Sequence, residues 1–151
     1  MNSLSRASFD ATRCPEAVRA LLYIVANEIP ALPLVYAART HGSMLMLKFG
    51  KLSEAPSRAG RKVPRPSGDW ELLIKLADWN LSGCKSASNA SDAQQIDEAI
   101  AEGVGLQVSE FTITPDGIIS IQLGSSVKYE VLPLGPSGYS LWSLYRSASW
   151  A

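Results

Sequence analysis

Histidine and cysteine are scarce in this sequence, and their scarcity excludes several kinds of chemistry. His41 is the only histidine in 151 residues, so a histidine-rich metal site is excluded, and a Ser-His-Asp triad would depend on one residue in an expected turn. Cys14 and Cys84 are the only cysteines and show no metal-ligand spacing, which favours free thiols in a reducing cytoplasm. We therefore expect no bound metal, no cofactor and no catalytic residue, and the sequence favours a protein that is not an enzyme.

A long uninterrupted apolar run is also missing. The apolar stretch 20–38 is broken by residues that a membrane-spanning helix rarely accepts together, namely Asn27, Glu28, Pro30 and Pro33. The first residues do not combine a basic segment with a clean apolar segment, as a secretion signal would. We therefore expect a cytoplasmic protein with no membrane partner.

Net charge is zero over the whole chain but not over its halves. Residues 1–68 contain ten Lys and Arg against four Asp and Glu, and residues 69–151 contain four against ten. Two interpretations stay open: oppositely charged surfaces that attract one another within one fold, or a binding surface on one half.

Alternating apolar residues predict a three-stranded meander between Leu106 and Leu132. Ile119, Ile121 and Leu123 share one face of a half-buried strand. The sequence Thr-Pro-Asp-Gly before that strand is typical of a hairpin corner. The expected strands are 106–113, 118–123 and 127–131. Because the apolar side of the first strand changes part-way, we expect a β-bulge near 109–110.

Further elements complete a single α+β domain in which two helices pack on a mostly antiparallel sheet of six or seven strands. Helices are predicted from 14 to 27, and from a Ser91 capping box to Gly103. Additional strands are expected at 32–38, 44–49, 70–81 and 139–145. The expected boundaries are a frayed N-terminus at 1–13, the domain at 14–145 with a mobile basic loop at 51–68, and a tail at 146–151.

The two helix-and-hairpin segments show similar patterns. Aligning Gly42 with Gly117 places Tyr36 on Phe111, and one extra residue then places Gly50 on Gly124. An internal duplication into two αββ halves and two ordinary αββ segments both stay open.

Polar residues within an apolar strand mark a candidate contact site. Asp78 interrupts a strand beside Trp79 and Asn80, so its carboxylate must be hydrogen-bonded or face a cleft. Tryptophan is enriched at interface hot spots, and the acidic half of the chain would suit a cationic protein. The candidate partner or ligand contacts are Asp78, Trp79, Asn80, Glu130 and Trp142.

A basic loop is the candidate for nucleic-acid contact. Clustered cations gain affinity by releasing counterions from phosphates, and the loop 48–65 contains Arg58, Arg61, Lys62 and Arg65. No aromatic residue for base stacking lies between Lys51 and Gly68. A solvated loop is the alternative.

Five features follow one another along the chain: Gly68-Asp69-Trp70-Glu71-Leu72, Trp79, a capped helix, Ile119–Gly124 and Tyr129-Glu130-Val131. This order resembles that of small uncharacterised bacterial domains, some of which are suspected to be immunity proteins of toxin systems. The resemblance covers about 49–142. It implies a bacterial cytoplasmic binding protein and transfers no catalytic residue.

The function expected from the sequence is therefore a non-enzymatic protein-binding module, immunity-like, whose acidic C-terminal half binds a cationic and still unknown protein partner. Nucleic-acid binding through the basic loop and a small-ligand or enzyme cleft near Asp78 and Trp79 are the alternatives. An exposed strand edge at 139–145 would allow a homodimer.

Overall fold

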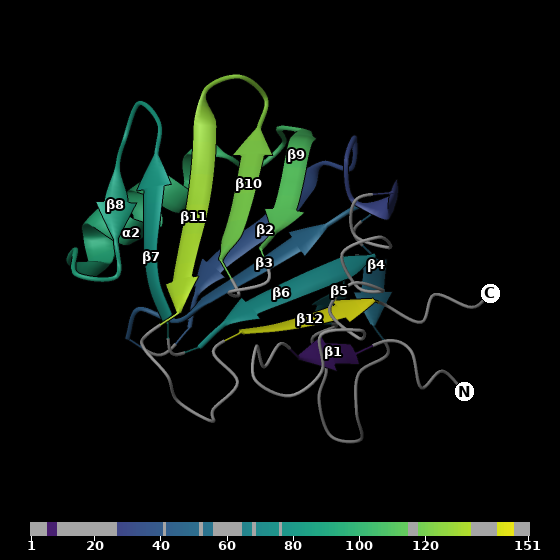
Figure 1. The fold of residues 1–151 in the computed structure, drawn as a ribbon. Helices are drawn as coiled ribbons and strands as arrows, with labels where there is room; N and C mark the ends of the chain where they lie inside the picture. The colour runs from purple at the N-terminus through teal and green to yellow at the C-terminus, as the bar shows by residue number, and fades with distance from the viewer. Residues whose placement is uncertain are drawn as a thin grey trace, which may run out of the picture.

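Two five-stranded antiparallel sheets face one another in this protein (Figure 1). The computed structural model describes residues 6–8, 27–40, 42–51, 53–55, 65–67, 69–75, 77–114, 118–133 and 142–146. The first sheet has the order β1 (Arg6–Ser8), β12 (Trp142–Arg146), β6 (Trp70–Ile74), β3 (Leu45–Phe49) and β2 (Leu34–Arg39). The second has the order β8 (Ala87–Ser88), β7 (Ala77–Ser82), β11 (Val127–Pro133), β10 (Ile119–Leu123) and β9 (Val108–Ile113).

Alternation of apolar and polar residues decides which side chains enter the space between the sheets. In β7, Trp79 and Leu81 are buried whereas Asp78 and Asn80 are exposed, as a period of two requires. The buried residues of both sheets form one continuous apolar cluster. A single core, shared by both sheets, therefore holds the molecule together.

Phe49 and Phe111 show how closely the two sheets approach. Phe49 belongs to β3 of the first sheet and Phe111 to β9 of the second. Their ring centroids lie 6.0 Å apart at an interplanar angle of 82°. This edge-to-face geometry is favourable for aromatic rings because the positive edge of one faces the negative face of the other.

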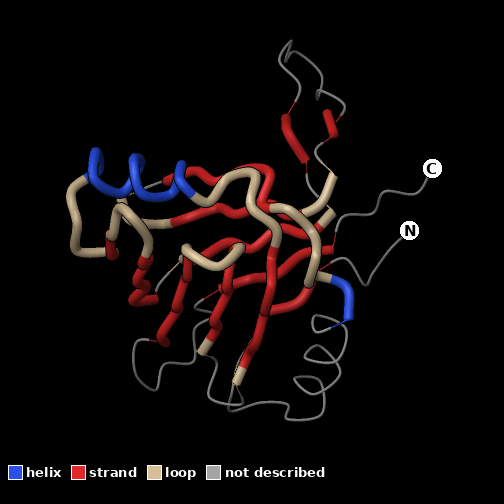
Figure 2. The backbone as a smooth tube through the Cα atoms, turned by 90° about the horizontal axis from the view of Figure 1, so that it is seen from above, coloured by secondary structure: helices blue, strands red, loops and turns tan. Residues whose placement is uncertain are grey.

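Helix α2 (Ala93–Glu102) packs against β2 of the first sheet and β8 of the second, and Figure 2 shows it lying along one side of the strands. Its buried residues are Ile96, Ala99 and Ile100. The N-cap is Asp92, whose carboxylate accepts from the Gln95 N–H at 2.8 Å. The expected Ser91 cap is therefore off by one residue, and the Ser91 hydroxyl accepts from the Ser88 N–H instead.

The single sheet of six or seven strands expected from the sequence is wrong, and the expected strand 70–81 shows why. It is two strands in different sheets: β6 lies in the first and β7 in the second. The buried positions change from even numbers in β6 to odd numbers in β7, so the chain crosses between sheets near Lys75. This change of phase was the sequence signal for the crossing.

Other expected boundaries also differ from the structure. Arg6–Ser8, expected to be frayed, forms β1 and pairs with β12. The basic loop contains β4 (Ser53–Ala55) paired with β5 (Arg65–Ser67). Because β12 is paired on both sides, it is not the free edge that a homodimer was expected to use. Of the expected first helix, 14–27, only Asn27 lies within the described residues. Within those residues, α2 is the only full helix. No described helix is long and apolar enough to cross a membrane.

Backbone hydrogen bonds of the two halves repeat at an interval of 74 residues, the distance along the chain from Ala31 to Gly105. The Ala31 N–H donates to the Val108 carbonyl oxygen at 2.7 Å, and the Gly105 N–H donates to the Leu34 carbonyl oxygen at the same distance. Pro33 and Gln107, again 74 apart, pair with each other where the two sheets meet. The two halves are thus related by an approximate twofold axis through that bridge.

The same interval relates the hairpins. The Thr40 N–H donates to the Met44 carbonyl oxygen at 2.8 Å, and the Thr114 N–H donates to that of Ile118 at 2.9 Å. Each hairpin also carries a register shift near the start of its first strand, at Val35 and at Ser109. The bulge expected near 109–110 is therefore confirmed. The Gly50–Gly124 alignment matches this interval, whereas the Gly42–Gly117 alignment is wrong by one residue.

Each half gives its last strand to the sheet of the other half. β7 ends the first half and pairs with β11 of the second sheet, and β12 ends the second half and pairs with β6 of the first. Trp79 opposes Val131, and Trp142 opposes Ile74. Val131 and Ile74 occupy equivalent positions in their sheets. The two tryptophans are therefore counterparts across the twofold axis.

Candidate functional site

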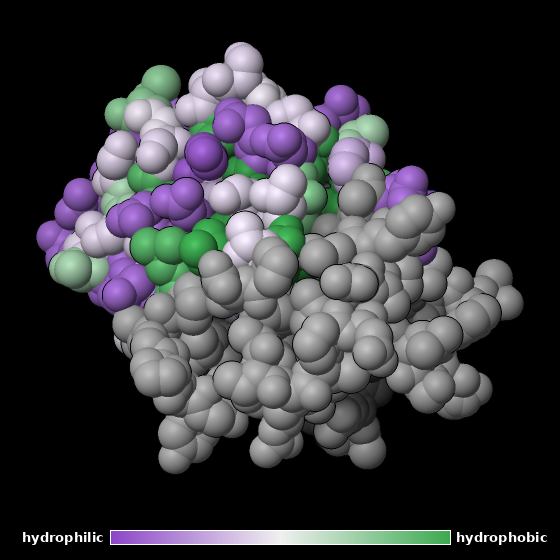
Figure 3. All heavy atoms as spheres, viewed as in Figure 1, coloured by the Kyte–Doolittle hydropathy of each residue, from purple (hydrophilic) through white to green (hydrophobic). Residues whose placement is uncertain are grey.

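The outer face of the second sheet is polar and lies open to solvent. Figure 1 shows no described helix in front of β7, β11, β10 and β9, and in Figure 3 mainly hydrophilic and near-neutral side chains cover these strands. The side chains that alternate onto this face are exposed or half-buried; they are Asp78, Asn80, Ser82, Glu110, Thr112, Ser120, Gln122, Lys128, Glu130 and Leu132. We call this set the outer polar face.

Carboxylates dominate the charge of the outer polar face. Asp78, Glu110 and Glu130 are set against a single ammonium group, that of Lys128. Glu130 lies in the middle of the sheet, opposite Asn80 on β7 and Ser120 on β10. Both cross-strand neighbours of Glu130 are thus neutral polar residues.

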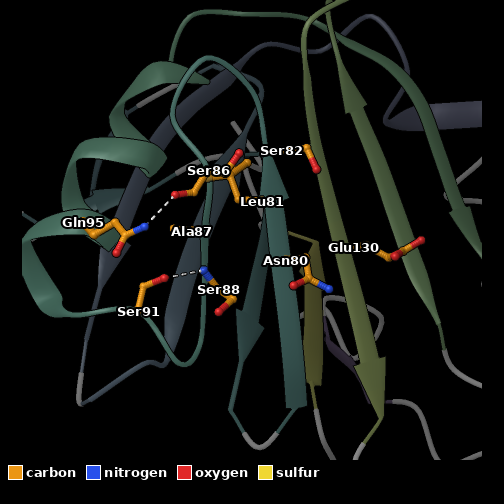
Figure 4. Close-up of a pocket in the computed structure, with 9 residues that line it drawn as sticks. All are labelled: Asn80, Leu81, Ser82, Ser86, Ala87, Ser88, Ser91, Gln95 and Glu130. Carbon is orange, nitrogen blue, oxygen red and sulfur yellow. Dashed lines mark hydrogen bonds between the residues drawn. The ribbon is translucent and has the colours of Figure 1, made fainter.

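A shallow depression adjoins the outer polar face where β7 meets β8 and the start of α2 (Figure 4). Its volume is about 470 Å³. The residues that line it are small or polar except for Leu81, and they are Asn80, Leu81, Ser82, Ser86, Ala87, Ser88, Ser91, Gln95 and Glu130. We call it the serine depression.

Local hydrogen bonds hold one side of the serine depression. The Gln95 side-chain amide donates to the Ser86 carbonyl oxygen at 3.1 Å, which ties α2 to the loop before β8. The Ser91 hydroxyl accepts from the Ser88 N–H at 2.9 Å. On the other side, the side chains of Asn80, Ser82 and Glu130 form no hydrogen bond or ion pair with any residue that the structure describes. Their hydrogen-bonding groups are available to a ligand.

Asp78 is held by a local network. The Asn89 side chain accepts from the Trp79 N–H at 2.9 Å and donates to the Asp78 carboxylate at 3.0 Å. The Asn89 N–H also donates to the Trp79 carbonyl oxygen. Hydrogen bonding of Asp78, one of the two alternatives left open by the sequence, is therefore observed, and the exposed carboxylate also contributes charge to the outer polar face.

Trp79 and Trp142 belong to the core, with exposed fractions of 0 % and 1 %. The Trp79 indole N–H donates to the Ser43 carbonyl oxygen at 2.9 Å, so its polar atom is satisfied inside the protein. Both residues were candidate partner contacts, and that assignment is wrong in this structure. Alternation explains the error, because Trp79 points inward between two residues that point outward.

Cys84 lies in a loop held by Glu102. The Glu102 carboxylate accepts from the Lys85 N–H at 3.0 Å and from the Cys84 N–H at 2.9 Å, and these bonds lower the pKa of Glu102. In turn, a hydrogen bond to Glu102 and the negative charge of Glu102 raise the pKa of the Cys84 thiol. Because the thiolate is the nucleophile, this environment makes Cys84 less reactive.

Most of the candidate nucleic-acid contacts lie outside the part of the chain that the structure describes. Arg58, Arg61 and Lys62 lie outside the described residues, and Arg65 belongs to β5, whose backbone alone is described. Lys48, at the start of the basic segment, is buried: its ammonium group lies 4.0 Å from the Glu71 carboxylate and 4.9 Å from the centre of the Tyr36 ring. Lys48 is therefore not available to a phosphate.

The residues that the structure describes contain no group of three or more side chains suited to hold a metal ion. Comparison with protein-family models, with curated proteins and with solved structures finds no match for this chain. The case for a function rests on the geometry of the site.

Sequence reasoning identified three of the site residues, Asp78, Asn80 and Glu130, and missed the serines and Gln95 of the depression. The segment 82–90 is small and polar and carries no apolar pattern that marks a strand. A usable signal was present, since four serines at positions 82, 86, 88 and 91 stand close together in the sequence. Only the pairing of β7 with β8 and β11 shows that these serines line the same depression as Glu130.

Proposed function

We propose that this protein is a non-enzymatic binding module that recognises a cationic protein partner through the outer polar face. The observation that carries the proposal is a difference between equivalent surfaces. On β2, β3 and β6 of the first sheet, whose outward side chains the structure describes, the outward positions are half-buried or buried and include Met46 and Leu73; the second sheet has Ser120 and Glu130 at the positions equivalent to these two. Among these described side chains, exposed carboxylates lie on the second sheet alone.

Electrostatic complementarity explains how such a surface would work. Three carboxylates against one ammonium group attract a basic surface and speed its association. Neutral hydroxyl and amide groups between them supply hydrogen bonds that orient the partner. The resemblance to immunity proteins favours a basic toxin domain as that partner.

The test is a charge reversal on the face with a matched reversal elsewhere. The tagged protein is used to capture its partner from a lysate of its native host, in three forms: wild type, Glu110→Lys with Glu130→Lys, and Asp97→Lys with Glu98→Lys on α2. The last pair makes the same charge change at side chains that are 54 % and 49 % exposed and lie off the face. Urea unfolding checks that all three forms fold.

We expect one partner to be recovered at similar levels with the wild type and the α2 variant, and at least about tenfold less with the face variant, because like charges would then oppose each other. Binding by the wild type should weaken as salt rises. Equal recovery with all three forms, or recovery of no stoichiometric partner even at low salt, would contradict the proposal.

A further inference from the structure

We infer that the serine depression receives an arginine side chain of the partner, with the guanidinium group bound by Glu130. This inference rests on the proposed function and names the anchoring contact. It starts from the position of Glu130, a half-buried residue in the middle of a sheet that lines a depression of about 470 Å³. Alternation places Asn80, Ser82 and Glu130 on the same face of β7 and β11, and in Figure 4 the Glu130 side chain points away from Ser91 and Gln95 on the far side of the depression.

The composition of the depression favours a cation. Glu130 is its only charged lining residue, and the other polar lining side chains are hydroxyls and amides. Among the described residues, Glu130 forms no ion pair. A half-buried carboxylate gains more from a counter-charge than an exposed one, because water screens it less. A bound cation would complete this site without displacing an internal partner.

The arrangement of acceptors favours arginine over lysine. A guanidinium group is planar and presents five N–H donors, two of which fit one carboxylate side by side. Glu130 offers such a carboxylate. On the neighbouring strand β7, Asn80 opposes Glu130, and Ser82 lies two residues further along, opposite Lys128. They can accept the remaining donors, whereas an ammonium group is a point charge with three donors and gains less from this spread.

Lys128 opposes the binding of a cation and supplies an internal check. It lies two residues from Glu130 on β11, on the same face, and it is exposed. Its charge should weaken attraction for arginine without blocking the depression. Replacing Lys128 with Gln should therefore strengthen binding, in the opposite direction to Glu130→Gln.

The experiment uses three blocked tripeptides as probes: acetyl-Gly-Arg-Gly-amide, its lysine counterpart, and its citrulline counterpart, which keeps the shape of arginine without the charge. Each is titrated into the full-length ¹⁵N-labelled protein and followed by NMR. We expect the arginine peptide to shift the side-chain amide signals of Asn80 and Gln95 and the backbone signals of 80–88 and 128–131. The lysine peptide should bind several-fold more weakly, and the citrulline peptide should produce no shift.

Two matched variants locate the charge. Glu130→Gln should weaken the arginine peptide by about tenfold or more, whereas Glu110→Gln, which removes the same charge from the same face outside the depression, should change its affinity by less than about twofold. Equal losses in both variants, equal affinity for the lysine peptide, shifts confined to another surface, or no shift with any peptide would overturn the inference. None of these results would overturn the proposed function, which the charge-reversal capture tests separately.

Discussion

The two sheets of this protein share a backbone frame and differ in what they present outward. Inside, the central positions of both sheets are buried: Leu45 and Leu47 of the first sheet correspond to Ile119 and Ile121 of the second. Outside, Lys48 of the first sheet is buried beside Glu71, whereas its counterpart Gln122 stands on an open polar face. Packing explains the similarity inside, because both sheets must fill one core.

The difference outside supports placing the proposed binding surface on the second sheet. Every outward residue of β2, β3 and β6 within the described chain is half-buried or buried, whereas β7, β9 and β11 each place at least one charged and exposed side chain on their outer face. Since the backbone frame is nearly the same, the fold does not require the second face to be polar. That polarity is the main reason for placing function there.

The largest expected effect tests whether the two halves pack equivalently in the core. Trp79→Ala and Trp142→Ala should each lower the free energy of unfolding by about 3–5 kcal/mol, because each removes a buried indole from an equivalent position. Urea unfolding measures both, with Trp→Phe as the smaller truncation if either alanine variant fails to fold. Ser82→Ala, at an exposed position of β7, is the control and should change the stability by less than about 0.5 kcal/mol.

A tryptophan variant that loses much less stability than its counterpart would show that the halves differ in how they pack. The comparison of the sheets would then be restricted to their backbones.

A smaller effect is expected at the connection that enters each hairpin. Ala31 and Gly105 are counterparts and both have positive φ, at 79° and 97°. A residue with a Cβ is strained there, so Ala31→Gly should raise the free energy of unfolding by about 0.5–1 kcal/mol and Gly105→Ala should lower it by about 1 kcal/mol. A Cβ at Gly105 would meet no atom within 4 Å, so backbone strain alone accounts for the loss.

Thermal or urea unfolding of the two variants and of the double variant checks this pair. The expected result is a change of opposite sign in the two single variants. Destabilisation by Ala31→Gly would contradict the equivalence of the two connections.

The smallest expected effect concerns a polar atom in the core that the equivalent position of the first sheet lacks. Tyr129 is fully buried, and its hydroxyl has no hydrogen-bond partner among the described residues; its counterpart in the first sheet is Leu72. Burial raises the pKa of the Tyr129 hydroxyl well above its ordinary value. Tyr129→Phe removes an unsatisfied polar group and should leave the stability unchanged or raise it by up to about 1 kcal/mol.

Unfolding in urea measures the Tyr129→Phe variant against Leu72→Ala, which should lower the free energy of unfolding by about 2–5 kcal/mol. A loss of more than about 1 kcal/mol in Tyr129→Phe would show that the hydroxyl is bonded.

Much of the local structure could be read from the sequence, since strands such as β10 and β3 follow directly from alternating apolar residues. Pairing between distant strands could not. β1 consists of Arg6, Ala7 and Ser8, which carry no apolar pattern, and its place in the sheet is provided by β12. The exchange of β7 and β12 between sheets likewise depends on long-range contacts that no local pattern contains.

The candidate site, like the fold, could be predicted only in part from the sequence. Asp78 and Asn80 could be identified because a polar residue in an apolar strand needs an explanation. Trp79 was misassigned because the two sides of its strand could not be distinguished before the second sheet was known. Glu130 was a candidate from the acidity of the C-terminal half, but its place in the lining of a depression follows only from the pairing of β7 and β11.

We propose that a cationic partner covers the outer polar face and leaves the carboxylates of α2 exposed. Carboxyl footprinting of the full-length protein, with and without the captured partner, tests it most directly. The account predicts that partner binding protects Glu110, Glu130 and Asp78 from modification while Asp97 and Glu98 on α2 react as before. Protection of the α2 carboxylates with unchanged labelling of Glu110 and Glu130 would contradict it.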